Sequence, residues 1–149
     1  MLIYLDMCCF NRPFDDQSQL LVRLQTEAKL HVQKFMLDGQ YKLVWSAVLD
    51  LENAANPDAR RRQAIAEWRL RASVDIDMAT SVESLAGEIA QKGIKPMDAL
   101  HVASAIISGA DWMLTTDRAL LRKMQTDTRI RVADPVDFIR QIEGGHDET

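Results

Sequence analysis

Short apolar runs alternate with longer segments of helical spacing along the chain. The first run, Leu2 to Leu5, stops at Asp6, which fits a strand buried on both faces of a parallel sheet. Similar runs predict further strands at residues 41–45, 74–77, 112–115 and 130–132. Between them apolar residues recur every three or four positions, which predicts helices over residues 17–37, 46–55, 80–91, 96–109, 117–124 and 135–142.

Capping and turn residues mark where several of these helices begin. Ser46 is predicted to cap the helix that follows the second strand. Asn56-Pro57 is predicted to open another helix, because proline suits the first helical turn. Thr80 or Ser81 is expected to cap the helix that follows the third strand.

The alternation of strands and helices predicts the fold class. Such an order favours right-handed crossovers, and therefore an α/β fold with a five-stranded, mostly parallel sheet flanked by helices on both faces. The chain has 149 residues, which suits a single domain. We expect this domain to span residues 1–142, with a flexible C-terminal tail over residues 143–149.

Two aspartates follow predicted strands directly. Asp6 comes after the first strand and Asp117 after the fourth. If these strands are adjacent in a doubly wound sheet, the two carboxylates meet at the switch point, where such folds bind ligands. Each also has an ordinary structural interpretation. Asp6 would then be a loop residue that accepts backbone hydrogen bonds, and Asp117 a helix N-cap.

Two further acids are expected near the same edge of the sheet. Asp98 lies in the first turn after Pro96, where the helix dipole favours a negative charge, and its helix leads into the fourth strand. Glu52 lies on the helix after the second strand, and its alternative is a solvated side chain paired with an arginine. Two such charges about 4 Å apart repel by roughly 4 kcal/mol at an effective dielectric of about 20. A cluster of these acids therefore needs protons or a hard cation such as Mg²⁺ or Mn²⁺, which could activate water against a phosphodiester.

Charge and cysteine content narrow the classes of function. The formal net charge of -4 argues against binding nucleic acid through a broad basic surface, but not against reaching phosphates through metal ions. No apolar run has the length of a membrane span. Cys8 and Cys9 are adjacent and are the only cysteines, so they suit neither an ordinary disulfide nor a zinc site. A reducing cytoplasm is the expected location.

Five segments together resemble the PIN domain family over nearly the whole chain: LDMCCFNRP, WSAVLDLEN, KPMDALHVASA, LTTDRALL and ADPVDFI. The resemblance implies a single α/β domain and a Mg²⁺- or Mn²⁺-dependent endoribonuclease, as in the toxins of VapC-like toxin–antitoxin pairs. It implies that Asp6, Asp98 and Asp117 bind metal and that Glu52 is the fourth catalytic acid, as a ligand or by orienting the attacking water. RNA as substrate, an antitoxin partner and a homodimer are the corresponding expectations.

The sequence departs from the family pattern at two places. Cys8 stands where many members have a serine or threonine that hydrogen-bonds near the metal, and a thiol is a weaker donor and acceptor. A long loop from Cys9 to Asp16 is expected in place of a short aliphatic turn. Thr115 keeps the hydroxyl expected two residues before the last acid.

A few basic side chains are weighed as possible contacts for the substrate. Arg12 and the run Arg60 to Arg62 are candidates for contacts with RNA phosphates, with a solvated helix face as the alternative for the run. His101, one turn after Asp98, is interpreted as a packed or hydrogen-bonded helix histidine.

Two rival functions remain open, a phosphate-accepting receiver domain and a non-catalytic interaction module. A receiver domain would have paired acids after its first strand, and Asp6 has no adjacent acid.

Overall fold

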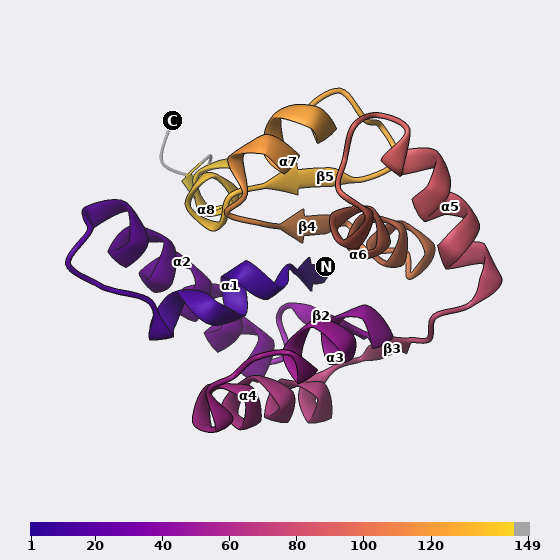
Figure 1. Cartoon of the computed structure of the whole chain (residues 1–149). Helices are drawn as coiled ribbons and strands as arrows, with labels where there is room; N and C mark the ends of the chain where they lie inside the picture. Colours follow the sequence, from indigo (N-terminus) through magenta and orange to yellow (C-terminus); the bar gives the residue numbers. More distant parts are fainter. Residues whose placement is uncertain (145–149) are drawn as a thin grey trace.

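A computed structural model of the chain describes residues 1–144. Its strands form one sheet in the order β3-β2-β1-β4-β5, and every neighbouring pair is parallel (Figure 1). The predicted α/β class and five-stranded sheet are therefore confirmed, and the first and fourth strands are adjacent. The strands are β1 (Leu2–Leu5), β2 (Lys42–Ser46), β3 (Val74–Ile76), β4 (Trp112–Leu114) and β5 (Arg131–Ala133).

Eight α-helices and two short 3-10 helices flank the sheet within the described residues. None of these helices combines the length and the apolar composition needed to cross a bilayer. Of the tail expected at residues 143–149, residues 145–149 lie outside the described part of the chain. The helices are α1 (Met7–Asn11), η1 (Arg12–Phe14), α2 (Leu20–Leu37), α3 (Ala47–Ala54), α4 (Ala59–Ala66), η2 (Glu67–Arg71), α5 (Thr80–Ala90), α6 (Pro96–Ile107), α7 (Arg118–Met124) and α8 (Pro135–Ile142).

The central strands lie inside the hydrophobic core. Ile3, Tyr4 and Leu5 of β1 are fully buried, as are Val44 and Trp45 of β2. Strands with helices on both sides have no solvent-facing side, which explains why the apolar runs that predicted them are continuous. Because β1 is the middle strand, the residue that follows it lies at the centre of the carboxyl edge of the sheet.

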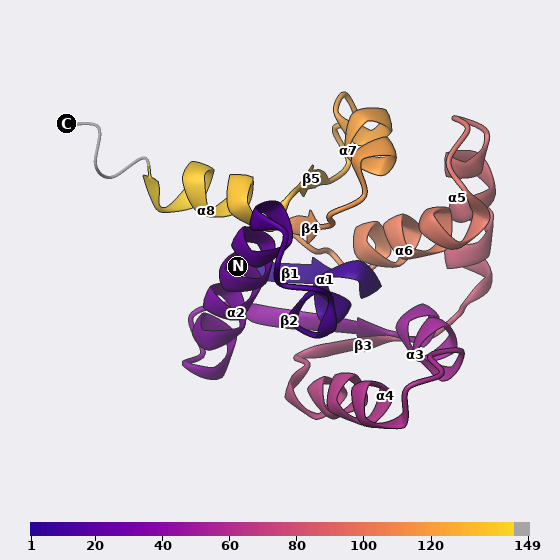
Figure 2. The same cartoon turned by 60° about the vertical axis from the view of Figure 1, so that its left-hand side comes forward.

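Helices pack in pairs around this sheet. Figures 1 and 2 both show α5 lying beside α6, and α2 lies beside η1 and α8. Helix α3, which follows β2 directly, contacts α1, α4 and α6. These contacts bring α3, α6 and the start of α1 to one edge of the sheet.

The helix predicted over residues 17–37 starts later than expected. It is α2, which begins at Leu20 and not at Gln17. Gln17 instead donates its side-chain amide to the carbonyls of Arg12 and Asp15, at 2.8 and 2.9 Å. Asp16 accepts hydrogen bonds from the backbone and the hydroxyl of Ser18. These local side-chain bonds compete with the helical pattern and delay the helix.

The long loop expected from Cys9 to Asp16 is also wrong. This stretch forms the end of α1 and the 3-10 helix η1. The carboxylate of Asp6 caps α1 by accepting a hydrogen bond from the backbone N–H of Met7, and the apolar side chains of Met7, Cys9 and Phe10 are buried. Burial of these side chains, together with the cap, overrides the turn-forming residues that follow.

Two predicted helix starts need correction, while Ser46 caps α3 as expected. Helix α4 is capped by Asp58 and not opened by Pro57, because the Asp58 carboxylate accepts hydrogen bonds from two N–H groups of the first turn. Helix α5 begins with Thr80 as its first residue after Ala79, and neither Thr80 nor Ser81 caps it with a side chain.

A buried lysine on α2 is an exception in the apolar core. Lys29 is only 4% exposed, and its Nζ lies 5.5 Å from the ring centre of Phe10 and 6.0 Å from that of Trp68. Burial lowers the pKa of Lys29 from 10.5 to about 8. Because this value lies below that of the unfolded chain, the unfolded state holds the proton more tightly, and the charged lysine opposes folding most strongly below pH 8.

We expect Lys29→Met to raise the free energy of unfolding at pH 7 by about 2 kcal/mol, because methionine removes the buried charge and keeps the volume. The gain should shrink toward pH 10, where the folded wild type has already lost the proton. Urea denaturation at pH 7 and pH 9.5 measures both effects. Lys34→Met on the exposed face of the same helix is the control, and an equal gain in this variant would contradict the explanation.

Candidate active site

Asp6 is held rigidly between β1 and β4. Its backbone N–H donates to the carbonyl of Leu114 at 2.9 Å, which continues the parallel pairing of the two strands by one residue. The carboxylate is buried and accepts hydrogen bonds from the N–H of Met7 and the hydroxyl of Thr115, both at 2.8 Å. Asp6 therefore presents its carboxylate at a fixed place on the carboxyl edge of the sheet.

The thiol of Cys8 lies beside this carboxylate. Its Sγ is 3.6 Å from Asp6 Oδ2 and 3.4 Å from the Thr115 hydroxyl, and it accepts a hydrogen bond from the N–H of Thr116 at 3.3 Å. The long sulfur distance makes the contact with Asp6 weaker than a hydroxyl would give. Thr115 supplies the short hydrogen bond to Asp6 and also accepts one from the N–H of Asp117 at 3.2 Å.

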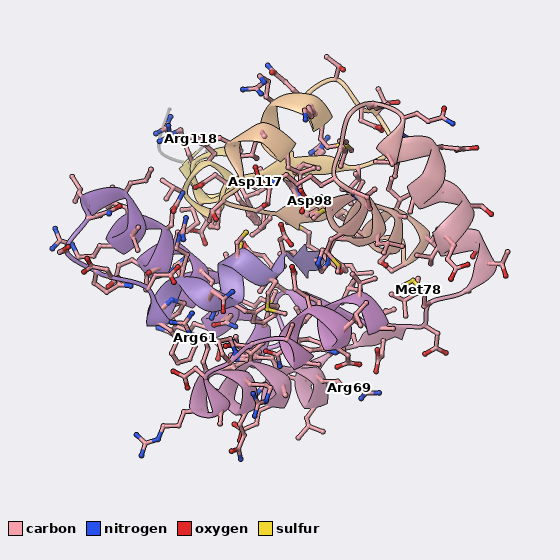
Figure 3. All side chains as sticks on the ribbon, in the orientation of Figure 1. Arg61, Arg69, Met78, Asp98, Asp117 and Arg118 are labelled. Atoms are coloured by element: carbon pink, nitrogen blue, oxygen red, sulfur yellow. The ribbon has the colours of Figure 1, made fainter. Side chains whose placement is uncertain are left out.

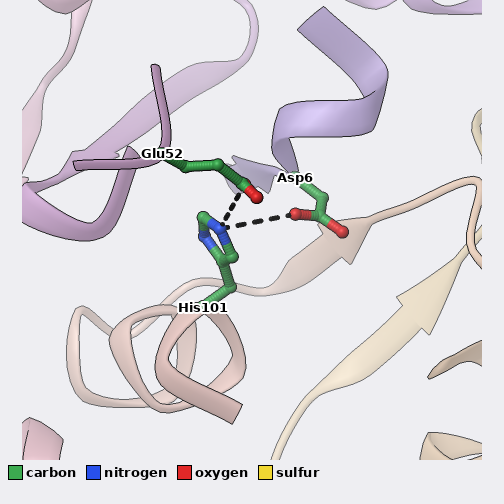
Figure 4. A group of neighbouring side chains, drawn as sticks. All are labelled: Asp6, Glu52 and His101. Atoms are coloured by element: carbon green, nitrogen blue, oxygen red, sulfur yellow. Dashed lines mark hydrogen bonds and ion pairs between the residues drawn. The ribbon is translucent and has the colours of Figure 1, made fainter. Parts of the chain in front are cut away.

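His101 of α6 occupies the centre of the site, as Figure 4 shows with Asp6 and Glu52. The imidazole is fully buried, and its Nε2 lies 2.9 Å from Glu52 Oε1 and 3.7 Å from Asp6 Oδ1. On the other side of the ring, Nδ1 lies 2.6 Å from the hydroxyl of Tyr4, which lies 2.7 Å from the hydroxyl of Ser46. The prediction of a hydrogen-bonded histidine is confirmed, but the sequence reasoning named no partner for it.

The two carboxylates decide the protonation of His101. Burial alone would lower the pKa of the imidazole, but the hydrogen bond that its Nε2–H donates to Glu52 and the negative charge of Asp6 outweigh this effect and raise the pKa. Burial raises the pKa of the Tyr4 hydroxyl well above its usual value, so this group stays neutral. The network therefore favours a positive charge on His101 that offsets part of the charge of Glu52 and Asp6.

Asp98 and Asp117 lie next to each other, as Figure 3 shows, in the first turn of α6 and at the start of α7. Asp117 caps α7 by accepting hydrogen bonds from the N–H groups of Ala119 and Leu120. Burial raises the pKa of the Asp98 carboxyl, and the negative charges of Asp6, Asp117 and Glu52 add to this effect, while His101 opposes it. The four predicted acids are therefore close enough to influence one another.

The possible metal-ligand atoms gather around His101, and Asp98 and Asp117 lie outside this group. Within residues 1–144, one group of acidic, cysteine and histidine side chains has ligand atoms all within 4.8 Å of one another, and its members are Asp6, Glu52 and His101. Asp98 and Asp117 do not belong to this group but add negative charge beside it. Carboxylate oxygens carrying excess negative charge are the donors that hard divalent cations prefer, so the residues present fit Mg²⁺ or Mn²⁺.

The arginine candidates are largely engaged elsewhere. Arg12 donates to Gln25 and to Asp15, each at 2.8 Å, and so does not point freely toward substrate. Arg62 donates to the carbonyl of Asn56 at 2.7 Å, and Arg60 is exposed.

The chain matches the PIN domain family over residues 4–125, and it therefore belongs to this family. No curated protein matches it in sequence. Its fold is similar to the crystal structure of VapBC2 from Rickettsia felis bound to a DNA fragment from their promoter, with a TM-score of 0.56 and 14% sequence identity. The match covers 90% of this chain and 98% of that chain, and at this identity it supports the fold alone.

Replacing Tyr4 tests the buried network behind the acids. We expect Tyr4→Phe to lower the free energy of unfolding by about 1–3 kcal/mol, because it leaves the buried Nδ1 of His101 without a partner and removes one of the two hydrogen bonds of the Ser46 hydroxyl. Chemical denaturation at pH 7 measures the loss. A change close to zero would show that the hydroxyl contributes nothing to the network.

Replacing Asp98 tests the repulsion among the acids. Without metal, we expect Asp98→Asn to raise the free energy of unfolding slightly, by less than about 1 kcal/mol after solvent screening. Mn²⁺ at about 100 times its Kd should then stabilise the wild type by about 2.7 kcal/mol and the variant much less. Thermal unfolding with EDTA or with MnCl₂ measures both effects.

Asp137→Asn is the matched control, because Asp137 is an exposed acid in the first turn of α8. An equal response to Mn²⁺ in Asp98→Asn and in wild type would contradict a role of Asp98 at the metal.

Proposed function

We propose that the protein is a metal-dependent endoribonuclease that hydrolyses RNA phosphodiesters with Mg²⁺ or Mn²⁺. Membership in the PIN domain family supports the nuclease class. The observation that carries the proposal is the convergence of Asp6 and Glu52 on His101, with Asp98 and Asp117 adding charge at the same edge of the sheet.

In this proposal Asp6, Asp98 and Asp117 hold the metal, and Glu52 is the fourth catalytic acid. A bound divalent ion would lower the pKa of a water molecule and stabilise the charge that develops on the phosphate. Glu52 orients the attacking water, and it is 34% exposed, so solvent reaches it. His101 is a positioning residue, because it is fully buried and holds Glu52 through a hydrogen bond of 2.9 Å.

A protein partner of the antitoxin kind is the second part of the proposal. An open, mainly apolar groove of about 560 Å³ lies between α2 and α8, and none of the four acids lines it. Leu24 and Leu30 line it and are both nearly half exposed. An exposed apolar face of this kind suits a protein partner. The homodimer and the cytoplasmic location stay predictions.

The same groove favours the second candidate function, a non-catalytic interaction module. The two functions differ in their need for the acids, because partner binding at α2 and α8 does not require them. Membership in the PIN domain family argues against the receiver-domain alternative.

Cleavage of a mixed-sequence oligoribonucleotide tests the nuclease directly. We expect Mn²⁺-dependent cleavage by the wild type, and losses of about 100-fold or more in Asp6→Asn and Glu52→Gln, because each removes a charge that acts in the reaction. Asp137→Asn, purified in parallel, should keep full activity and so controls for contaminating nucleases. Unchanged cleavage in the site variants, or in excess EDTA, would refute the nuclease and favour the interaction module.

A further inference from the structure

Glu52 depends on a single neighbour for its position. It lies on α3, and its side chain is 34% exposed. Among residues 1–144 its carboxylate has one hydrogen-bond partner, Nε2 of His101 at 2.9 Å (Figure 4). A partly exposed glutamate on a helix ordinarily samples several rotamers, and fixing it in one of them costs side-chain entropy. The place of Glu52 is therefore decided by how firmly the imidazole of His101 is held.

The imidazole is held at its far side by Tyr4. One ring nitrogen, Nε2, bonds to Glu52, while Asp6 Oδ1 at 3.7 Å is too distant for a hydrogen bond. The other nitrogen, Nδ1, lies 2.6 Å from the Tyr4 hydroxyl, and the two rings meet edge to face with their centres 5.8 Å apart. Tyr4 and His101 are both fully buried, so bulk solvent does not compete for this bond. The Tyr4 hydroxyl thus fixes the plane of the imidazole and the direction of its Nε2.

Ser46 fixes the Tyr4 hydroxyl in turn. Its Oγ lies 2.7 Å from that hydroxyl and, as the N-cap of α3, accepts a hydrogen bond from the N–H of Leu49 at 3.1 Å. Three consecutive hydrogen bonds therefore run from Ser46 through Tyr4 and the imidazole to Glu52. The chain starts at the cap of α3 and ends on the same helix, so it forms a closed ring that ties α3 to β1 and α6.

This chain can run in either direction without changing its effect on Glu52. A hydroxyl both donates and accepts, so Ser46 and Tyr4 can pass hydrogen bonds toward Nδ1 of His101 or receive them from it. An ionised carboxylate only accepts, so the Nε2–H donates to Glu52 in both arrangements. Tyr4→Phe keeps nearly the size of the side chain but breaks the chain next to the imidazole.

We propose that Tyr4 is a positioning residue of the ribonuclease, which acts through His101 to hold the Glu52 carboxylate where it orients the attacking water. The inference rests on the proposed ribonuclease function and extends it to a fully buried residue that cannot reach the RNA. Misplacing a catalytic group by about 1 Å can cost on the order of 100-fold in rate. Because Tyr4 acts on the reacting groups and not on RNA binding, its loss should lower kcat and leave KM unchanged.

Cleavage kinetics with Mn²⁺ and a mixed-sequence oligoribonucleotide test this role. We expect kcat of Tyr4→Phe to fall about tenfold or more, with KM within about twofold of the wild type. Thr26→Val is the matched control, because the buried hydroxyl of Thr26 donates to the carbonyl of Arg12 at 3.0 Å and takes no part in the chain. It should lose stability and keep its kcat. An unchanged kcat in Tyr4→Phe, or an equal loss in Thr26→Val, would overturn the inference.

A double variant separates positioning from general damage to the site. If Tyr4 acts through Glu52, Tyr4→Phe should cause no further loss of kcat in a protein that already carries Glu52→Gln, whereas independent effects multiply. Single-turnover cleavage at high enzyme concentration measures these low rates. The full tenfold loss in the Glu52→Gln background would overturn the role of Tyr4 as a positioning residue.

Crystal structures of the metal-free wild type and of Tyr4→Phe give a readout that needs no activity. We expect Glu52 at hydrogen-bond distance from Nε2 in the wild type, and a turned imidazole or several Glu52 conformers in the variant. His101 and Glu52 in unchanged places in the variant would overturn the inference. A wild type that cleaves no RNA, together with a displaced Glu52 in Tyr4→Phe, would refute the nuclease and leave the positioning of Glu52 by Tyr4 standing.

Discussion

The parallel pairing of β1 with β4 is the constraint on which the rest of the site depends. It sets Leu5 opposite Leu114, so Asp6 and Thr115 are the next residues on adjacent strands. The hydrogen bonds from Met7 and Thr115 then fix the Asp6 carboxylate where two strands and three helices meet. An acid held in this way cannot turn away from its neighbours, so their charges must be balanced at this place.

The charge balance within the chain is only partial. His101 lies between Glu52 and Asp6, and its raised pKa shows that the two carboxylates stabilise a positive charge there. Asp98 receives less compensation, since burial and three other acids raise its pKa and His101 only partly opposes them. A folded chain that keeps such repulsion gives up some stability for its site, and a bound cation would recover it.

The sequence predicted site residues well where an acid directly follows a predicted strand. The apolar run that stops at Asp6 and the fourth strand before Asp117 were enough to predict an acid at the end of each strand. That the two strands are adjacent was a condition of the prediction, and the sheet order meets it. The role of His101 could not be predicted, because it depends on the contact of α3 with α6, which brings together residues 49 positions apart. Its spacing of one turn from Asp98 was the available signal.

Errors in the prediction arose where side chains compete locally for backbone groups. The start of α2 moved because of Gln17 and Asp16, and the start of α4 because Asp58 caps it. A cavity lined by Asn11, Asn53 and Arg61 was equally hidden, because it forms where residues of α1, α3 and α4 meet and no local sequence pattern signals that contact. Patterns in sequence identify what a helix buries, but not which polar atoms remain free.

The position of a bound metal ion tests the central claim most directly. Crystals grown with MnCl₂ and measured at the manganese absorption edge would locate the ion by its anomalous signal. The account predicts a peak at coordination distance, about 2.0–2.3 Å, from a carboxylate oxygen of Asp6, with Asp98 or Asp117 as a further ligand. A peak elsewhere on the protein, or none at saturating Mn²⁺, would contradict it.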